Sequence, residues 1–219
     1  LNESNRGSLT IAASDIISRL LLIGPLQQFK IQFPGIDFTL LNTTSSQASE
    51  LVKNAEADLG FVISQKQTQP LHFTELQQIK WCALGDGFEL GGIKGNQFEN
   101  KPEETKPQDE LTLILLGHDT RTRDVIDAAL PELYLPDYRV MEVGSVDAQI
   151  DWAEAGFGVA IIPEFAILTK PHLKSKVTYL PNFPTTSLGY VVRKNQILSK
   201  PIKRLLNWVN DGIINSQRR

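Results

Sequence analysis

The sequence predicts an α/β protein built from two lobes with a cleft between them. Strand-like apolar runs alternate along the chain with segments of helical periodicity. Two stretches repeat one plan, in which a strand is followed by a hydroxyl-rich turn, a helix and another strand. The length of 219 residues allows two small domains. Because strands joined by helices pair in parallel with right-handed crossovers, each lobe is expected to contain a parallel sheet.

The first unit begins with a buried strand at residues 9–13 (LTIAA), which ends at the helix-capping residues Ser14 and Asp15. Residues 16–29 then carry apolar side chains at helical spacing. Gly24 and Pro25 should kink this helix or restart it, because proline lacks the N–H that the helix needs. The other expected elements of this unit are strands at 36–41 and 58–63, a helix at 47–54, and a strand at 76–84 that leaves the unit.

The second unit follows a glycine-rich segment at 85–108, which is expected to be a surface loop. It opens with the apolar strand LTLILL at 111–116 and the polar turn Gly117–Thr120. The elements expected after this turn are helices at 121–130, 148–155 and 163–169, strands at 138–143, 159–162, 176–180 and 187–193, and an amphipathic C-terminal helix at 200–214.

The stretch AEAGFGVAIIPE (153–164) contains a glycine-aromatic-glycine triplet that could be a phosphate loop or the end of a helix. A phosphate loop follows a strand and precedes a helix, whereas this stretch runs helix, glycines, strand, helix. We therefore expect Gly156 to end a helix in a left-handed conformation. Phe157 should pack inward, and residues 159–162 should form a buried strand.

Composition excludes several classes of protein. A net charge of −3 argues against a chain whose whole surface binds DNA. One cysteine, Cys82, cannot form an intramolecular disulfide and suits a reducing compartment. No apolar run approaches the roughly 18 residues needed to cross a membrane, and the first residues show no export signal. The three histidines are scattered, so no metal site is expected.

Catalytic residues are not predicted. A serine, histidine and aspartate set could be assembled from Ser14 or Ser145 with His118 and Asp119, but no serine lies in a GxSxG turn. Cys82 lies in an apolar segment, which favours a buried and unreactive thiol. We therefore expect no catalytic residue, no cofactor and no metal.

Four junctions between a strand and a helix carry small polar residues. In open α/β sheets, ligands bind beyond the carboxyl ends of the strands, where helix N-termini present free N–H groups. Hydroxyls and amides at such positions suit a small anion. The alternative at each junction is that the residue only caps its own helix. The junctions are Ser14 and Asp15, residues 43–46, residues 117–120, and residues 144–146.

Three stretches, taken in order, resemble one protein family. The start RGSLTIAASD…LLLIGPLQQFKIQFPGIDFTLL, the segment NAEADLGFVI and the unit VGSVDAQIDWAEAGFGVAIIPE are similar to the effector-binding (co-inducer) region of LysR-type transcriptional regulators. The resemblance covers nearly the whole chain, from about Arg6 onward. One departure is Ala55, which stands where the family usually has a glycine.

The resemblance implies a periplasmic-binding-protein-like (type II) fold, with two Rossmann-like lobes joined by two crossover strands. Lobe I would comprise residues 7–84 and 187–219, and lobe II residues 85–186. Full-length members begin with a winged helix-turn-helix, so the chain is expected to be a regulatory fragment without its DNA-binding domain. The positions that match the family's effector site are Ser14, Asp15, Thr43, Thr44, Ser45, Ser145 and Val146, with His118 and Thr120 as further candidates.

The resemblance also implies partners. Members pair lobe I of one chain with lobe II of another, which would place the helix at 16–29 against the partner's helix that starts at Pro163. A homodimer, a tetramer in the full-length protein, a small-molecule effector and a cytoplasmic location are expected. DNA would be bound only through the N-terminal domain. The alternatives are a solute-binding protein of a transporter and, third, an enzyme on the same architecture.

Overall fold

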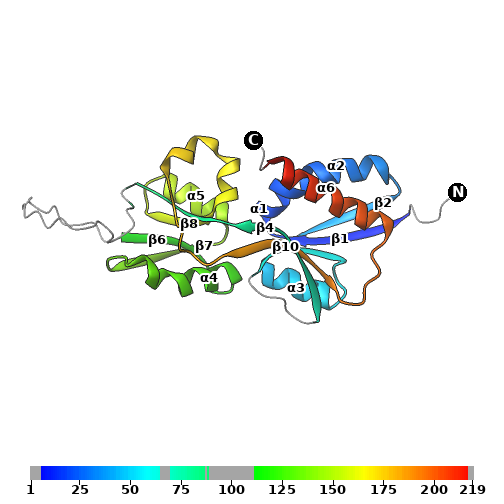
Figure 1. Cartoon of the computed structure of the whole chain (residues 1–219), viewed down its shortest axis with the longest axis horizontal. Coiled ribbons are helices and arrows are strands. Elements are labelled where there is room, and N and C mark those ends of the chain that lie inside the picture. The colour runs from blue at the N-terminus through cyan, green and yellow to red at the C-terminus, as the bar shows by residue number, and fades with distance from the viewer. Residues whose placement is uncertain (1–5, 65–69, 87, 89–110, 217–219) are drawn as a thin grey trace, which may run out of the picture. The chain divides into compact units, whose positions relative to one another are not determined.

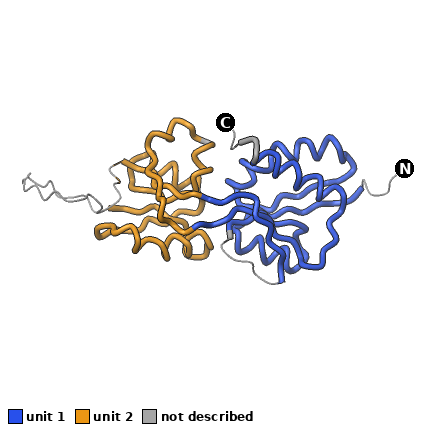
Figure 2. Tube along the Cα trace, in the orientation of Figure 1, with its two compact units in different colours: residues 1–79, 185–219 blue, residues 80–184 orange. Residues whose placement is uncertain are grey.

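A computed structural model describes residues 6–64, 70–86, 88 and 111–216 of the chain. The chain divides into two compact units, residues 1–79 with 185–219 and residues 80–184 (Figure 2). It passes from the first unit to the second and back, so there are two connections. These divisions lie a few residues from the boundaries that the sequence suggests, at 84/85 and 186/187, because residues 81–84 pair only with strands of the second unit.

Unit 1 contains a five-stranded sheet with helices on both faces (Figure 1). Its order is β2-β1-β3-β10-β4, in which the first three strands are parallel and β10 runs antiparallel to both of its neighbours. Helices α2 and α6 lie on one face and α3 on the other. The bounds are β1 Gly7–Ala13, β2 Ile36–Asn42, β3 Leu59–Ser64, β4 Leu71–Ile79, β10 Thr186–Arg193, α1 Asp15–Ile17, α2 Ile23–Gln32, α3 Ser45–Lys53 and α6 Lys200–Ser216.

The first helix is interrupted, as Gly24 and Pro25 suggest, but the irregular turn comes before them. A π-helical segment, Ser18–Leu22, separates α1 from α2. Pro25 lies in the first turn of α2. A proline ring clashes with the carbonyl four residues earlier, and that carbonyl belongs to Leu21 within the π-helical segment. The wider turn therefore falls where the α-helical hydrogen bond is lost.

Unit 2 repeats the plan of unit 1. Its sheet order is β7-β6-β8-β5-β9, with β6, β7 and β8 parallel and β5 antiparallel to β8 and β9. The bounds are β5 Trp81–Leu84, β6 Leu111–Leu116, β7 Tyr138–Val143, β8 Val159–Pro163, β9 Val177–Tyr179, α4 Arg121–Ala129, α5 Val146–Glu154, and the short 3-10 helices Leu130–Leu133, Glu164–Thr169 and Pro171–Lys176.

Two expectations about individual elements are wrong. The single strand expected at 76–84 is two strands, β4 and β5, which belong to different sheets. The break falls at Lys80, which is exposed between buried Ile79 and buried Trp81.

Phe157 does not pack inward: 56% of it is exposed, and its ring makes an edge-on contact with that of Trp152 at 4.6 Å between centroids.

The α-helices α3 and α5 both end at a left-handed residue. Gly156 follows α5 with φ +82°, as its sequence predicts, and Phe157 N–H donates to the Trp152 carbonyl at 3.1 Å. Ala55 follows α3 with φ +62°, which is unfavourable for a residue with a Cβ. Arg193 binds the C-terminal end of α3. Its guanidinium donates hydrogen bonds to the carbonyls of Val52 and Ala57 at 2.9 and 3.0 Å.

Replacing Ala55 by glycine is expected to stabilise the protein. The change removes the left-handed penalty but adds chain entropy to the unfolded state, so we expect a gain of about 0.5–1 kcal/mol in the free energy of unfolding. Urea denaturation followed by circular dichroism would measure it. Ala128→Gly, at an exposed site of ordinary helix in α4, should instead lose a similar amount. Equal effects of the two changes would contradict the prediction.

Candidate functional site

At the carboxyl edge of the unit 1 sheet, the candidate residues of two neighbouring strands come together. Ala13 pairs with Asn42 in register, and the Thr43 N–H donates to the Ala13 carbonyl at 3.1 Å. Ser14 and Thr43 therefore adjoin. The Ser14 hydroxyl makes no capping bond to the helix that follows it. Asp15 is engaged by Arg19, with 2.9 Å between Oδ2 and Nε. The Ser14 hydroxyl thus remains available to a ligand.

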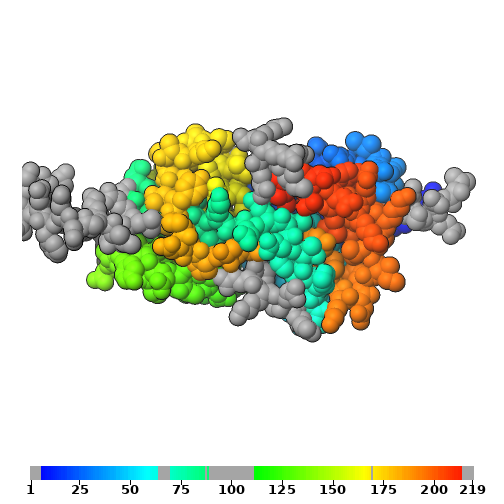
Figure 3. Space-filling model, in the orientation of Figure 1, coloured from blue at the N-terminus to red at the C-terminus, as the bar shows by residue number. Residues whose placement is uncertain are grey.

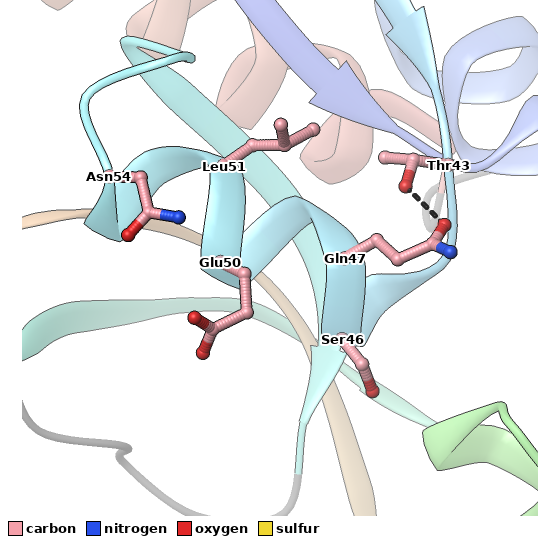
Figure 4. Close-up of a pocket in the computed structure, with 6 residues that line it drawn as sticks. All are labelled: Thr43, Ser46, Gln47, Glu50, Leu51 and Asn54. Atoms are coloured by element: carbon pink, nitrogen blue, oxygen red, sulfur yellow. Dashed lines mark hydrogen bonds between the residues drawn. The ribbon is translucent and has the colours of Figure 1, made fainter.

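The hydroxyls of Thr43, Thr44 and Ser45 are used within the unit. Thr44 and Gln47 form a reciprocal capping box, and the Thr43 hydroxyl donates to the Gln47 Oε1 at 2.7 Å (Figure 4). The Ser45 hydroxyl accepts from the Ile63 N–H at 3.0 Å, which ties α3 to β3. Thr44 therefore caps α3 through its side chain. The backbone N–H groups of the first turn still point out of the helix end.

A shallow hollow of about 400 Å³ runs along the outer side of α3 (Figure 4). Its lining offers hydroxyl and amide groups, one carboxylate and one apolar side chain. It shares Thr43 with the strand-edge group but contains neither Ser14 nor Ser45. The lining residues are Thr43, Ser46, Gln47, Glu50, Leu51 and Asn54.

The unit 2 sheet brings together a matching group at its own carboxyl edge. Leu116 pairs with Val143 in register, so the turn after β6 and the start of α5 adjoin. The Thr120 hydroxyl donates to the Gly117 carbonyl at 2.9 Å and accepts from the Arg123 N–H at 3.2 Å.

Ser145 likewise caps α5, because its hydroxyl accepts from the Ala148 N–H at 3.1 Å. The side chain of Val146 is buried, so only its backbone could meet a ligand. Thr120 and Ser145 thus also cap the helices that follow them. The N-termini of α4 and α5 open at one edge, as those of α1 and α3 do in unit 1.

His118 belongs to a cluster of charged side chains around Arg123. Arg123 is 4% exposed and donates to the Leu116 carbonyl at 2.9 Å, to Asp127 at 2.7 Å and to Glu142 at 3.1 Å. Burial lowers the pKa of Arg123, but the hydrogen bonds to Asp127 and Glu142 outweigh that effect and raise it. His118 lies against this cluster, with Nε2 at 3.0 Å from the guanidinium.

Sequence reasoning missed Arg123. The signal that could have found it is its spacing of four residues from Asp127, on the side of α4 that also carries the buried Ile126. A second arginine, Arg193, is engaged within unit 1. Its guanidinium is bound to the carbonyls of Val52, in the last turn of α3, and Ala57, just after the helix.

Cys82 is buried, and the burial raises the pKa of its thiol to about 12, with the nearby charge of Glu164 acting in the same direction. The nucleophilic thiolate is therefore scarce at neutral pH. We expect the native protein to resist a thiol-specific reagent at pH 7 to 8 and to react fully once unfolded by guanidinium. A fast reaction of the native protein would contradict the buried placement.

Within the described ranges, no helix is long and apolar enough to span a membrane. The same residues contain no group of three or more His, Cys, Asp or Glu side chains placed to hold a metal ion.

The fold and the two strand-edge groups define a two-unit α/β ligand-binding region. A family model described as the LysR substrate binding domain matches residues 2–213, so the chain belongs to that family. The family comprises the effector-binding domains of LysR-type transcriptional regulators, with two lobes of type II periplasmic-binding-protein-like fold. The match supports the regulator interpretation and not that of a transporter's solute-binding protein.

Individual relatives agree with this assignment. A probable RuBisCO transcriptional regulator from Phaeodactylum tricornutum is 24% identical over 96% of this chain and 72% of its own length. The regulatory domain of Synechocystis PCC6803 CcmR, solved with 2-PG, has a TM-score of 0.69 at 18% identity, covering 94% of this chain and 97% of that one. The effector-binding domain of QuiR, solved with shikimate, has a TM-score of 0.67 at 17% identity, covering 94% and 96%.

Proposed function

We propose that this chain senses a small anionic metabolite, which it binds through the strand-edge groups of its two units, and passes the binding event to the DNA-binding domains of a transcriptional regulator. The observation that carries the proposal is the repetition of one device in both units. In each, two helix N-termini and small polar residues adjoin at the carboxyl edge of a sheet. Ser14, Asp15 and Thr43–Ser45 would form one half of the site, and His118, Thr120, Ser145 and Val146 the other.

The anionic character of the effector is inferred from these helix ends. Unpaired backbone N–H groups and the helix dipole both favour negative charge. CcmR and QuiR were solved with 2-PG and shikimate, which makes these two compounds the first ligands to test. The proposal includes no catalysis, since His118 is engaged by Arg123 and carboxylates and not by a nucleophile. A cytoplasmic location follows from the proposed role.

Binding would act by selecting one relative arrangement of the lobes. A ligand shifts such an equilibrium only by the difference in its affinity for the two arrangements. Thermal melting and isothermal titration with 2-PG, shikimate and their uncharged analogues would test the proposal. Saturable stabilisation by an acid but not by its uncharged analogue is expected. If none of a broad panel of small carboxylates and phosphates binds, the proposal is wrong.

Ser14 offers the cleanest variant, because its hydroxyl caps nothing. Ser14→Ala should weaken binding by about two- to tenfold, the value of one hydrogen bond, with little change in stability. The matched control is Ser199→Ala at the start of α6, where the hydroxyl accepts from the Ile202 N–H at 3.5 Å. Equal affinities of the two variants would remove Ser14 from the site.

We also propose that the chain forms a homodimer through the edge strands of its two sheets. Unpaired edge strands with exposed apolar side chains are sites of association. In unit 1 such side chains lie on β2 and α2, and in unit 2 on β7, on α5 and on the helix at 164–169. They are Ile23, Ile31, Phe38 and Leu40, and Tyr138, Val140, Trp152 and Leu168.

Charged substitutions on these strands are expected to break the dimer. Leu40→Asp and Val140→Asp should each give a monomer in sedimentation velocity, because each buries a charge in an apolar contact. Ile197→Asp is the control: Ile197 is 94% exposed in the loop between β10 and α6, a loop that lies on the surface of unit 1 in the space-filling view (Figure 3). A parent chain that sediments as a monomer, or a control that dissociates equally, would overturn this interface.

A further inference from the structure

Arg123 joins four parts of unit 2 through one buried side chain. Its guanidinium contacts the Leu116 carbonyl at the end of β6, Asp127 on its own helix and Glu142 on β7. Its remaining contact is the His118 ring, which lies in the turn that precedes α4. Movement of this turn is therefore linked through one side chain to the edge strand β7.

His118 cannot make all of its close contacts at once. Nε2 lies 3.0 Å from the Arg123 Nη2 and 3.1 Å from the Glu142 Oε1. The Nε2 atom can accept a hydrogen bond from Arg123 only when Nε2 carries no proton. It can donate a hydrogen bond to Glu142 only when Nε2 carries a proton. These two hydrogen bonds exclude each other.

Each of the two hydrogen bonds requires a different tautomer of the neutral ring. If Nε2 accepts from Arg123, the proton must lie on Nδ1, which is 3.7 Å from the Asp127 Oδ2. The groups that face the ring are thus Arg123 and Asp127 from α4 and Glu142 from β7, with Asp119 beside it in the turn. Protonation of the His118 ring replaces its hydrogen bond with the Arg123 guanidinium by a repulsion between two cations. It also allows Nε2 to donate a hydrogen bond to the Glu142 carboxylate.

We infer that His118 is a proton-operated switch that couples the turn Gly117–Thr120 to the edge strand β7. The neutral ring holds the turn against Arg123, and the protonated ring transfers its hydrogen bond to Glu142. Thr120 moves with the ring, because its hydroxyl is bonded both to Gly117 and to the Arg123 backbone. Where the proposed effector site includes this turn, effector affinity will depend on pH. The switch itself requires no effector.

Nitrogen-15 NMR of the histidine rings tests the inference on the unliganded chain. The chain has three histidines, and His172 is an internal control. Its Nε2 lies 2.8 Å from the Glu154 Oε1, so neutral His172 should carry its proton on Nε2. His118 should show the opposite tautomer, with its proton on Nδ1. His118→Gln identifies the signals. An Nε2–H tautomer at His118 would overturn the inference.

The coupling is tested by recording the backbone NMR signals of the unliganded chain over a series of pH values. The backbone signals of Thr120 and Glu142 should shift together with the His118 ring signals. In Glu142→Gln the shift at Thr120 should shrink, whereas Glu132→Gln, an exposed carboxylate of the same unit, should leave it unchanged. A titration confined to the His118 ring, with Thr120 and Glu142 static, would overturn the switch. Such a result would leave effector binding untouched, since that is measured separately by calorimetry.

Discussion

Replacing Gly158 by alanine is expected to lower the free energy of unfolding by roughly 3 kcal/mol or more, since steric overlap with backbone in a packed core is among the costliest changes. Gly158 directly precedes β8, where β8 runs beside β6. A Cβ there would overlap the Thr112 carbonyl oxygen and lie 3.0 Å from the Thr112 Cβ. The obstacle is the backbone of the central sheet, which cannot rotate away as a flexible side chain could.

Gly158 also has φ +156°, so its substitution adds backbone strain to this overlap, and two other glycines of the same unit show what strain and open space do alone. Gly144 has open space around it, so Gly144→Ala should change stability by less than about 0.5 kcal/mol. Gly156 is equally open but has φ +82°, so Gly156→Ala should cost about 1–2 kcal/mol. Urea unfolding of the three variants should give the order Gly144, Gly156, Gly158. A Gly158→Ala protein no less stable than Gly156→Ala would show that β8 can move away from β6.

The alternation of strands and helices could be predicted because each element carries its own local signal. Apolar runs such as LTLILL and capping residues such as Thr44 and Ser145 mark where elements begin. The separation of β4 from β5 could not be predicted from the sequence. A segment with one exposed lysine between two apolar runs has the same pattern as a single continuous strand. What decides it is the sheet to which each run pairs, and pairing is a long-range property.

The candidate site could be predicted only at the level of strand ends. Register places Ser14 beside Thr43, and the turn after β6 beside Ser145, as expected for parallel strands. Which hydroxyls remain available could not be predicted, because capping and ligand binding use the same residue types at the same positions. Arg123 was hidden for a related reason: its partners Leu116 and Glu142 are brought to it by β6 and β7.

Replacing Arg123 by methionine is expected to destabilise the protein by about 2–4 kcal/mol. Methionine keeps much of the apolar stem but leaves the Leu116 carbonyl without its donor in a buried position. Asp127 and Glu142 also lose their shared cation; both are partly exposed, so water recovers part of that loss. Arg123→Lys should recover only a fraction, because a single ammonium cannot reach the carbonyl and both carboxylates in the guanidinium's geometry.

Arg121, two residues earlier on α4, is the matched control for this change. It is half-buried but makes no hydrogen bond or ion pair with any residue that the structure describes. A cation in the first turn opposes the helix dipole, so Arg121→Met should be neutral or slightly stabilising. Guanidinium unfolding of the two variants should therefore differ by at least about 2 kcal/mol. Equal stabilities would mean that Arg123 is solvated in solution. Its hydrogen bonds to the end of β6 and to β7 would then contribute nothing to the free energy of unfolding.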